Sequence, residues 1–208
     1  MNVDNPLIIV TVENVNSSFS VTCSLDLRHI VLAEKNVELH KGHLTMKLRR
    51  PRATASIHSS GRIVCTGSTS VSESRVAARR FARRLQKLGY EVKLQNFKVT
   101  CVMGSCNMPF AIDLIPFSQK FSSASFVDSV RHHVVRYKID DLKAIARVHA
   151  TGYIYVLAPS IKNLRSAIKH IFPLVKACGR MQTKEEKKKY HLRNLKRYIK
   201  KYGFDKKL

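Results

Sequence analysis

The sequence predicts an α+β protein whose two duplicated halves, related by a pseudo-twofold axis, form one curved antiparallel sheet with helices on its convex side. The segment IHSSGRI at Ile57–Ile63 returns as VHATGYI at Val148–Ile154, so a strand, a tight Ser/Thr-Gly turn and another strand occur twice. A long stretch with helical periodicity follows each copy. Two halves of this kind can share one sheet and offer one continuous face to a partner.

The first half predicts a helix, a strand meander and a second helix. Residues 25–32 form the first, short helix, after a mixed stretch that extends to Cys23. Between Val37 and Thr66 apolar and polar residues alternate, which is typical of antiparallel strands with one apolar face. Ser70 and Glu73 form a capping-box pattern at the start of a helix that ends at Gly89. This helix should cover the apolar sheet face and leave an arginine-rich back in solvent.

The second half repeats this order. Residues 101–114 parallel residues 14–27, strands are predicted at 134–139, 143–149 and 153–157, and a helix runs from Ser160 to about Lys176. Beyond Gly179 the chain is rich in lysine and suits a basic amphipathic helix. We therefore divide the chain into a first repeat at 7–90, a second repeat at 91–178 and a basic tail at 179–208.

The charge balance indicates an anionic partner. Lys and Arg number 38 against 14 Asp and Glu, a net charge of +24. Lysine and arginine near phosphates release condensed counterions, so nucleic acid is the favoured partner class. The alternatives are a basic chain that is merely soluble and one that binds an acidic protein. Five cysteines without a CxxC pair, and no stretch long enough for a membrane span, predict an intracellular soluble protein with reduced thiols and no membrane contact.

Placing the helices on the apolar side leaves the concave sheet face bare. That face is basic and rich in hydroxyl groups, as expected of a surface that contacts phosphates. The alternation within the strands assigns to it Thr45, Lys47, Arg49, Thr54, Ser56, His58, Val64, Thr66, Lys138, Arg147, His149, Tyr155 and Leu157.

Several segments resemble the TATA-box-binding protein family. They are MKLRRPRATA at 46–55, SSGRIVCTG at 59–67, SRVAARRFARRLQKLG at 74–89, NFKV at 96–99 and GSC at 104–106. The resemblance covers nearly all of residues 7–178, and NMPF at 107–110 is similar to the TBP-like factor branch. It implies a saddle of ten antiparallel strands with four helices above, and DNA held beneath in a widened minor groove.

Family members kink TATA DNA with phenylalanine wedges at both ends of the site and read its centre with two asparagines. At the wedge positions this sequence has Lys41 and His58 in the first half, and His149 with Arg131 or His132 in the second. The leucines that flank the inner wedges correspond to Ser56 and Arg147, and the asparagine pair corresponds to Asn14 and Cys101.

These replacements remove the apolar wedges. A wedge must offset lost base stacking, a few kcal/mol per step, and lysine or arginine prefers phosphates instead. We therefore expect TATA kinking to be lost or weakened, while salt-sensitive DNA attraction with little sequence preference persists. Two alternatives stay open: His58 and His149 are simply exposed polar replacements, or they read a different minor groove together with Arg147, with pH dependence.

The resemblance also implies protein partners. General transcription factor IIA engages the first-half edge strand and stirrup, here around residues 36–49, which makes Glu38 and His40 candidate contacts. General transcription factor IIB uses an acidic stirrup, but residues 126–131 contain only Asp128 as an acidic residue, so that contact is doubtful. Two saddles could also pair through their concave faces without DNA. An acidic partner could dock on the basic helix through Arg75, Arg79, Arg80, Arg83 and Lys87.

Catalysis and cofactor binding are not predicted. His132 and His133 with Cys101 and Cys106 match no common zinc spacing. The sequence also lacks the helix-hairpin-helix and the catalytic Asp that a glycosylase requires. We predict a nuclear, non-enzymatic, TBP-like core-promoter factor for RNA polymerase II. It would act at TATA-less promoters through contacts of the factor IIA type, with weak nonspecific DNA binding; the alternative is a minor-groove binder of altered specificity.

Overall fold

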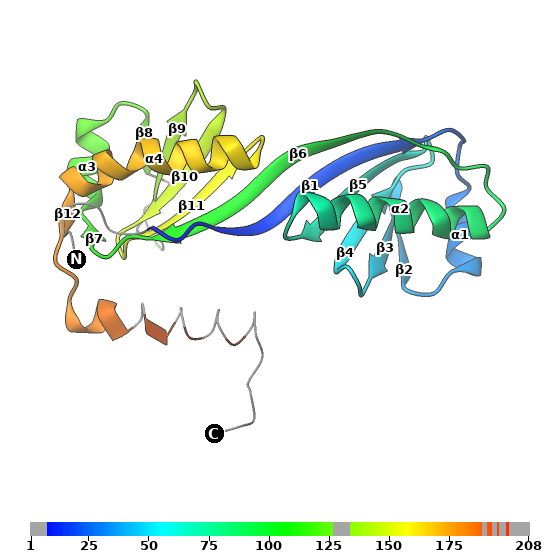
Figure 1. The fold of residues 1–208 in the computed structure, drawn as a ribbon, viewed down its shortest axis with the longest axis horizontal. Coiled ribbons are helices and arrows are strands. Elements are labelled where there is room, and N and C mark those ends of the chain that lie inside the picture. The colour runs from blue at the N-terminus through cyan, green and yellow to red at the C-terminus, as the bar shows by residue number, and fades with distance from the viewer. Residues whose placement is uncertain (1–7, 127–133, 189–190, 193–194, 196–198, 200–208) are drawn as a thin grey trace.

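The computed structural model describes residues 8–126, 134–188, 191–192, 195 and 199. Two lobes are joined by two long neighbouring strands (Figure 1). The elements follow in the order β1 (Thr11–Val21), α1 (Leu27–Ala33), β2 (Val37–His40), β3 (His43–Leu48), β4 (Ala53–Ile57), β5 (Arg62–Ser68), α2 (Val71–Lys87), β6 (Leu94–Asn107), β7 (Ala111–Ile112), α3 (Leu114–Lys120), β8 (Ala124–Phe126), β9 (Val134–Ile139), β10 (Ala144–His149), β11 (Tyr153–Ala158), α4 (Ile161–Ala177) and β12 (Gly179–Arg180).

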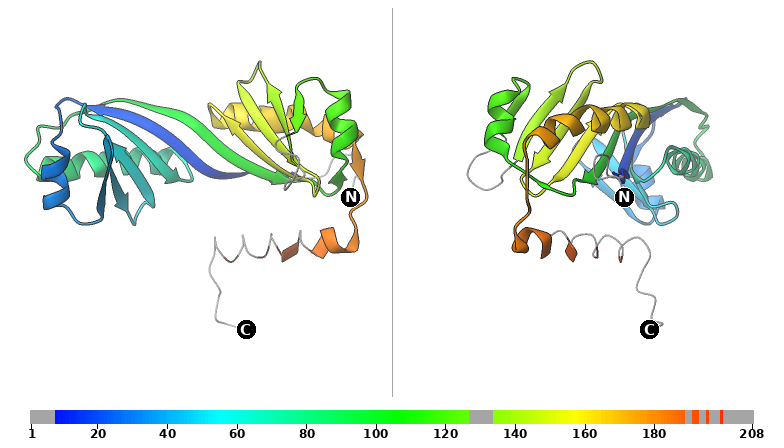
Figure 2. Two further views of the ribbon diagram at one scale, coloured as in Figure 1. Left: turned by 180° about the vertical axis from the view of Figure 1, so that it is seen from behind. Right: turned by 60° about the vertical axis from the view of Figure 1, so that its left-hand side comes forward.

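One ten-stranded antiparallel sheet runs through both lobes, which confirms the predicted fold class. Its strand order is β2-β3-β4-β5-β1-β6-β11-β10-β9-β8, with the long strands β1 and β6 side by side at the centre (Figure 2). Their pairing extends from Thr11 opposite Ser105 to Val21 opposite Leu94. The sequence did not predict β1 as a strand, because register shifts beside Glu13 and Ser17 break its two-residue alternation.

The helices begin where side chains can cap them. Asp26 accepts hydrogen bonds from the backbone of Arg28 and His29, so α1 begins at Leu27 and not at the predicted Leu25. Ser70 caps α2 by accepting from the backbone N–H of Glu73, at 3.1 Å, as the capping-box pattern predicts. Ser160 caps α4 in the same way through Asn163.

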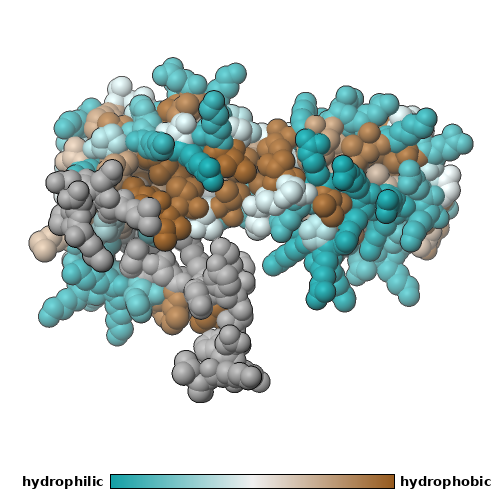
Figure 3. Space-filling model, viewed as in Figure 1, coloured by the Kyte–Doolittle hydropathy of each residue, from teal (hydrophilic) through white to brown (hydrophobic). Residues whose placement is uncertain are grey.

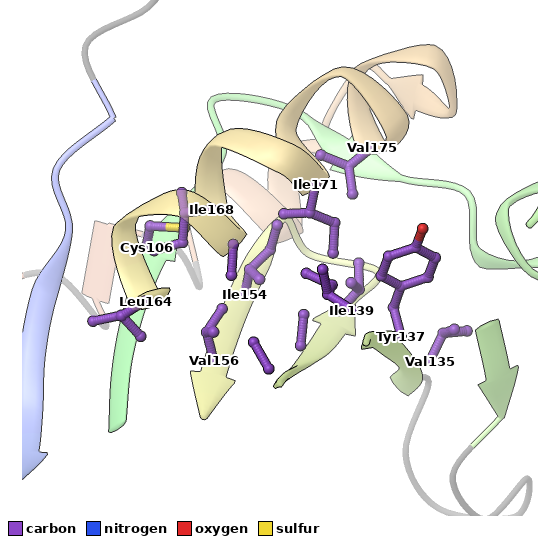
Figure 4. Close-up of a cluster of buried hydrophobic side chains, with 14 of the residues drawn as sticks. Cys106, Val135, Tyr137, Ile139, Ile154, Val156, Leu164, Ile168, Ile171 and Val175 are labelled. Carbon is purple, nitrogen blue, oxygen red and sulfur yellow. The ribbon is translucent and has the colours of Figure 1, made fainter. Parts of the chain in front are cut away.

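Each lobe has its own hydrophobic core beneath one long helix. In the first lobe α2 buries Ala78, Phe81 and Leu85 against the strands. In the second lobe Leu164, Ile168 and Ile171 of α4 lie over Ile154 and Val156 of β11 (Figure 4). Fully buried aliphatic side chains of this kind stabilise a fold by about 1.5–3 kcal/mol each. The two cores leave the opposite face of the sheet for a partner.

The repeated motif forms the same turn in both lobes. Gly61 and Gly152 have φ of +80° and +83°, and each donates its N–H to the preceding histidine carbonyl, of His58 and His149, at 3.0 Å. A Cβ at Gly61 would lie 2.7 Å from a backbone carbonyl oxygen, and one at Gly152 would lie 2.2 Å from the carbonyl oxygen of Phe110. Glycine is therefore required at both turns for conformation and for space.

Beyond β12 the basic tail begins as a helix. Thr183 caps it by accepting from the backbone of Glu186, and the Glu186 carboxylate accepts from the N–H of Thr183 in return. Arg180 donates two hydrogen bonds to the same carboxylate, and these lower the pKa of Glu186 to about 2. The start of the tail helix is thus fixed to the end of the second repeat.

Candidate nucleic-acid interface

The sheet face opposite the helices brings most of the predicted residues together. In the first lobe Thr45, Ser56 and Val64 lie opposite one another across β3, β4 and β5. Lys47, Thr54 and Thr66 form the neighbouring row across the same strands. The face is therefore a surface of hydroxyl groups and small apolar groups, in which cations are sparse.

The positive charge of Lys47 is partly offset by a neighbouring carboxylate. Its ammonium donates to the Glu38 carboxylate at 2.5 Å, and this hydrogen bond holds the pKa of Glu38 below its usual range. Glu38 lies on β2, the outermost strand of the sheet at the first lobe, where one backbone edge has no strand partner among the described residues. His40 on the same strand bonds Thr45 at 3.1 Å.

The centre of the face lies where β1 and β6 pair. Asn14 is fully engaged: its amide nitrogen donates to Thr66 at 3.0 Å, and its oxygen accepts from the N–H of Gly67 at 2.8 Å. Cys101 lies opposite Asn16, and burial raises the pKa of the Cys101 thiol. The buried Oδ1 of Asn16 has no hydrogen-bond partner among the described residues. One oriented amide, one unsatisfied amide and a thiol thus line the centre.

In the second lobe two arginines meet on adjacent strands. Arg147 lies opposite Arg136 on one side and Tyr155 on the other, and Leu157 and Lys138 occupy the next row. Both arginines are exposed, and no ion pair with a described residue neutralises either guanidinium. Paired cations on a sheet face repel each other unless an anion lies between them. Sequence reasoning missed Arg136, although its two-residue spacing from Lys138 places it on the same face.

A carboxylate also lies on this face and was not predicted. Glu13 lies where β1 is bulged, and Ser105 of β6 donates to its Oε1 at 2.5 Å. Burial raises the pKa of Tyr155, and the nearby Glu13 charge raises it further. A negative group here opposes phosphates but can accept hydrogen bonds from base amino groups. The sequence pattern did not place Glu13 on this face, because the bulge interrupts the two-residue alternation that assigns side chains to a face.

The predicted wedge positions carry histidines in contact with further rings. His43 stacks on His40, with ring centroids 5.0 Å apart, and lies 5.8 Å from His58. In the second lobe the rings of His149 and Tyr153 are 5.2 Å apart. Lys41 is exposed in the β2–β3 turn, and the predicted Arg131 lies outside the described residues. The imidazoles are therefore packed on neighbours and are smaller and more polar than apolar wedges.

The predicted protein-binding face of α2 divides into two parts. The Arg75 guanidinium lies 4.8 Å from the Phe97 ring centroid. Farther along the helix, three of the predicted residues line a cleft together with Arg49, which lies past the end of β3 in a turn and not in the strand row. These three are Arg80, Arg83 and Lys87.

Neither a metal-binding cluster nor a membrane-spanning helix occurs among the described residues. No group of three or more His, Cys, Asp or Glu side chains there could hold a metal ion. No described helix is long and apolar enough to cross a membrane.

Comparison with known proteins identifies the fold and the family. The family model for transcription factor TFIID, or TATA-binding protein, matches residues 9–88 and 96–178. The chain belongs to the TATA-binding protein family. The members of this family are non-enzymatic transcription factors, and the duplicated saddle fold is theirs.

Individual relatives agree with this assignment. The chain is 42% identical over 172 residues to TATA box-binding protein-like 1 of Danio rerio, covering 81% of this chain and 92% of the relative. It is 34% identical over 176 residues to TATA box-binding protein-like 2 of Mus musculus, but spans only 50% of that protein. The solved Methanococcus jannaschii TBP superposes with a TM-score of 0.72 at 20% identity, covering 81% of this chain and 98% of the other. The chain is thus a TBP-like transcription factor.

Proposed function

We propose that this protein is a nuclear core-promoter factor for RNA polymerase II that is recruited mainly through protein contacts and associates with DNA weakly, without TATA specificity. The observation that carries the proposal is the chemistry of the wedge positions. Lys41, His58 and His149 stand where TATA kinking needs large apolar side chains. Without wedges the gain from wrapping bent DNA is lost, and attraction to phosphates remains.

The distribution of charge supports the same proposal. On the first-lobe face Lys47 is paired with Glu38, and Glu13 adds a second carboxylate near the centre. The unpaired cations of the second lobe, Arg136 and Arg147, can hold a phosphate backbone but are too few for tight binding. Each phosphate contact contributes a salt slope of about 0.9, so weak and salt-sensitive binding follows.

A factor IIA-type partner fits the outer edge of β2. This strand offers an open backbone edge, and its exposed Glu38 and His40 lie beside it. Edge strands recruit partners by extending the sheet. Replacing Glu38 with lysine should weaken factor IIA capture in a purified pull-down, while the exposed control Glu91→Lys should not. Equal capture by both variants would argue against this edge.

The direct test is fluorescence anisotropy with a TATA duplex and a composition-matched scramble, each titrated at low and near-physiological salt. The proposal expects the two duplexes to bind alike and to lose affinity steeply as salt rises. A TATA duplex that remains much tighter at the higher salt would refute it.

A second candidate function is a minor-groove binder of altered specificity, and Glu13 favours it. The G·C pair alone presents an amino donor, guanine N2, in the minor groove, and a carboxylate is an acceptor for it. Glu13 lies on the DNA-facing side beside Ser105 and near Tyr155, and Tyr155 lies opposite Arg147. A strong preference for a G·C-containing duplex at raised salt would support this candidate over the first.

A further inference from the structure

A cleft on the first lobe, which meets the DNA-facing rows only at Lys47, is lined almost entirely by cations. It lies between the turn after β3 and the second half of α2, and its volume is about 650 Å³. Figure 3 shows hydrophilic side chains gathered over this lobe. The lining residues are Asn36, Lys47, Leu48, Arg49, Arg50, Arg80, Arg83, Arg84 and Lys87.

The positive charge in this cleft is only partly neutralised. Glu38 pairs with Lys47, and the Glu34 carboxylate lies 3.8 Å from Nη1 of Arg84, too far for a hydrogen bond. That same Nη1 is buried and has no hydrogen-bond partner among the described residues. The five remaining cations have no ion pair with a described carboxylate. A buried donor without an acceptor is costly, so Arg84 adds positive charge to the cleft wall that Glu34 offsets only in part.

The two walls of the cleft are joined to each other. Arg80 donates through Nη1 to the backbone carbonyl of Arg50, which ties the turn to α2. Arg49 and Arg83 then face a common space from a turn and from a helix. Fixed guanidinium groups can hold phosphate oxygens in pairs, a geometry that ammonium groups alone do not offer.

The size and lining of the cleft indicate the class of ligand. Its volume falls in the range of about 300–1,000 Å³ that small molecules occupy. Leu48 is the sole apolar side chain among the lining residues, so the cleft lacks anchors for a peptide or a nucleobase. A duplex presents its phosphates on a wide convex cylinder and cannot enter a recess between a turn and a helix. Phosphate monoesters carry about −1.5 to −2 each, so about three of them would balance five cations.

We propose that this cleft binds a compact, multiply phosphorylated small molecule of the linear polyphosphate or inositol polyphosphate class. This site goes beyond the proposed promoter function, because every lining residue except Lys47 lies outside the DNA-facing rows. It also gives Arg80, Arg83 and Lys87 a ligand of their own, separate from the acidic protein partner predicted for the α2 face.

Titration calorimetry on the full chain near physiological salt tests the proposal, with tripolyphosphate and inositol hexakisphosphate as separate probes. Arg83→Gln removes a cleft guanidinium, and Arg79→Gln removes the same charge one turn away on the same helix, outside the cleft. We expect Arg83→Gln to weaken at least one probe about tenfold, since a charged hydrogen bond is lost, and Arg79→Gln to change affinity less than twofold. The tighter probe identifies the source of the phosphates.

Three outcomes would overturn the proposal. Equal losses in the two variants would mean diffuse attraction to a basic protein without a specific site. Tighter binding of a glutamate-rich peptide of matched charge would make the cleft a docking site for a protein segment. Absence of binding by both probes would leave no polyphosphate site. DNA anisotropy of Arg83→Gln should match that of the charge-matched Arg79→Gln, which separates this test from the promoter proposal.

Discussion

The pair Arg147 and Arg136 gives the sharpest test of how this face contacts DNA. The two residues lie directly opposite on β10 and β9, where Cβ atoms are about 4.5–5.5 Å apart, and both side chains are exposed. If each arginine holds one phosphate, Arg147→Gln should reduce the magnitude of the negative slope of log affinity against log salt by about 0.9. The double variant, which also replaces Arg136, should reduce it by about 1.8. Between about 50 mM and 200 mM salt, each lost contact corresponds to an affinity change of about threefold.

Arg147→Gln should weaken DNA binding without lowering the free energy of unfolding. Two like charges opposite each other on a sheet destabilise it, and exposure to solvent reduces the effect to a few tenths of a kcal/mol. Removing one guanidinium should therefore leave the free energy of unfolding unchanged or raise it slightly, by about 0.2–0.5 kcal/mol. Loss of DNA affinity in a variant that is no less stable cannot be attributed to unfolding.

Fluorescence anisotropy over a salt series, combined with urea denaturation, measures both quantities. Arg165→Gln is the matched control, because Arg165 is exposed on α4, on the other side of the sheet. If Arg147→Gln alters the salt slope no more than Arg165→Gln does, then the arginine pair does not bind phosphate. That result would also contradict the assignment of this face of the second lobe to DNA binding.

Three further substitutions and reactions test other parts of the structure. Gly152→Ala should lower the free energy of unfolding by several kcal/mol more than Gly42→Ala. Both have positive φ, but only at Gly152 would the Cβ meet a carbonyl oxygen at 2.2 Å; equal thermal midpoints would contradict this. Glu13→Gln should raise affinity for A·T-rich duplex in anisotropy at constant salt, because it removes a negative charge from the face; a decrease would mean that the carboxylate aids binding. Burial raises the pKa of Cys106 to about 12, so at pH 8 it stays a thiol and should react with a disulfide reagent only on unfolding. The partly exposed Cys23 should react in the native protein. Mass spectrometry of labelled peptides measures the order of reaction, and earlier labelling of Cys106 would contradict this.

Local patterns in the sequence predicted many elements of the fold. The repeated turn around Gly61 and Gly152, the cap at Ser70 and the alternation within β3 to β5 are each set by a few neighbouring residues. Such features depend on backbone geometry and short-range hydrogen bonds, which act the same way in any context. The first residue of α1 was placed two positions early, because a cap at Asp26 fixes the start more sharply than apolar periodicity does.

The sequence by itself determined the duplication and the polar sheet face that the helices leave open, since these follow from residue types at regular spacing. Only the tertiary structure decided which charges on that face are free. Lys47 forms an ion pair with Glu38, Glu13 lies on the face at a bulge in β1, and Arg136 lies opposite Arg147 on the neighbouring strand. The cationic cleft likewise joins a turn near residue 50 to a helix thirty residues later, as the Arg80 to Arg50 hydrogen bond shows. Charge pairing depends on distances between residues far apart in the chain, and only packing sets those distances.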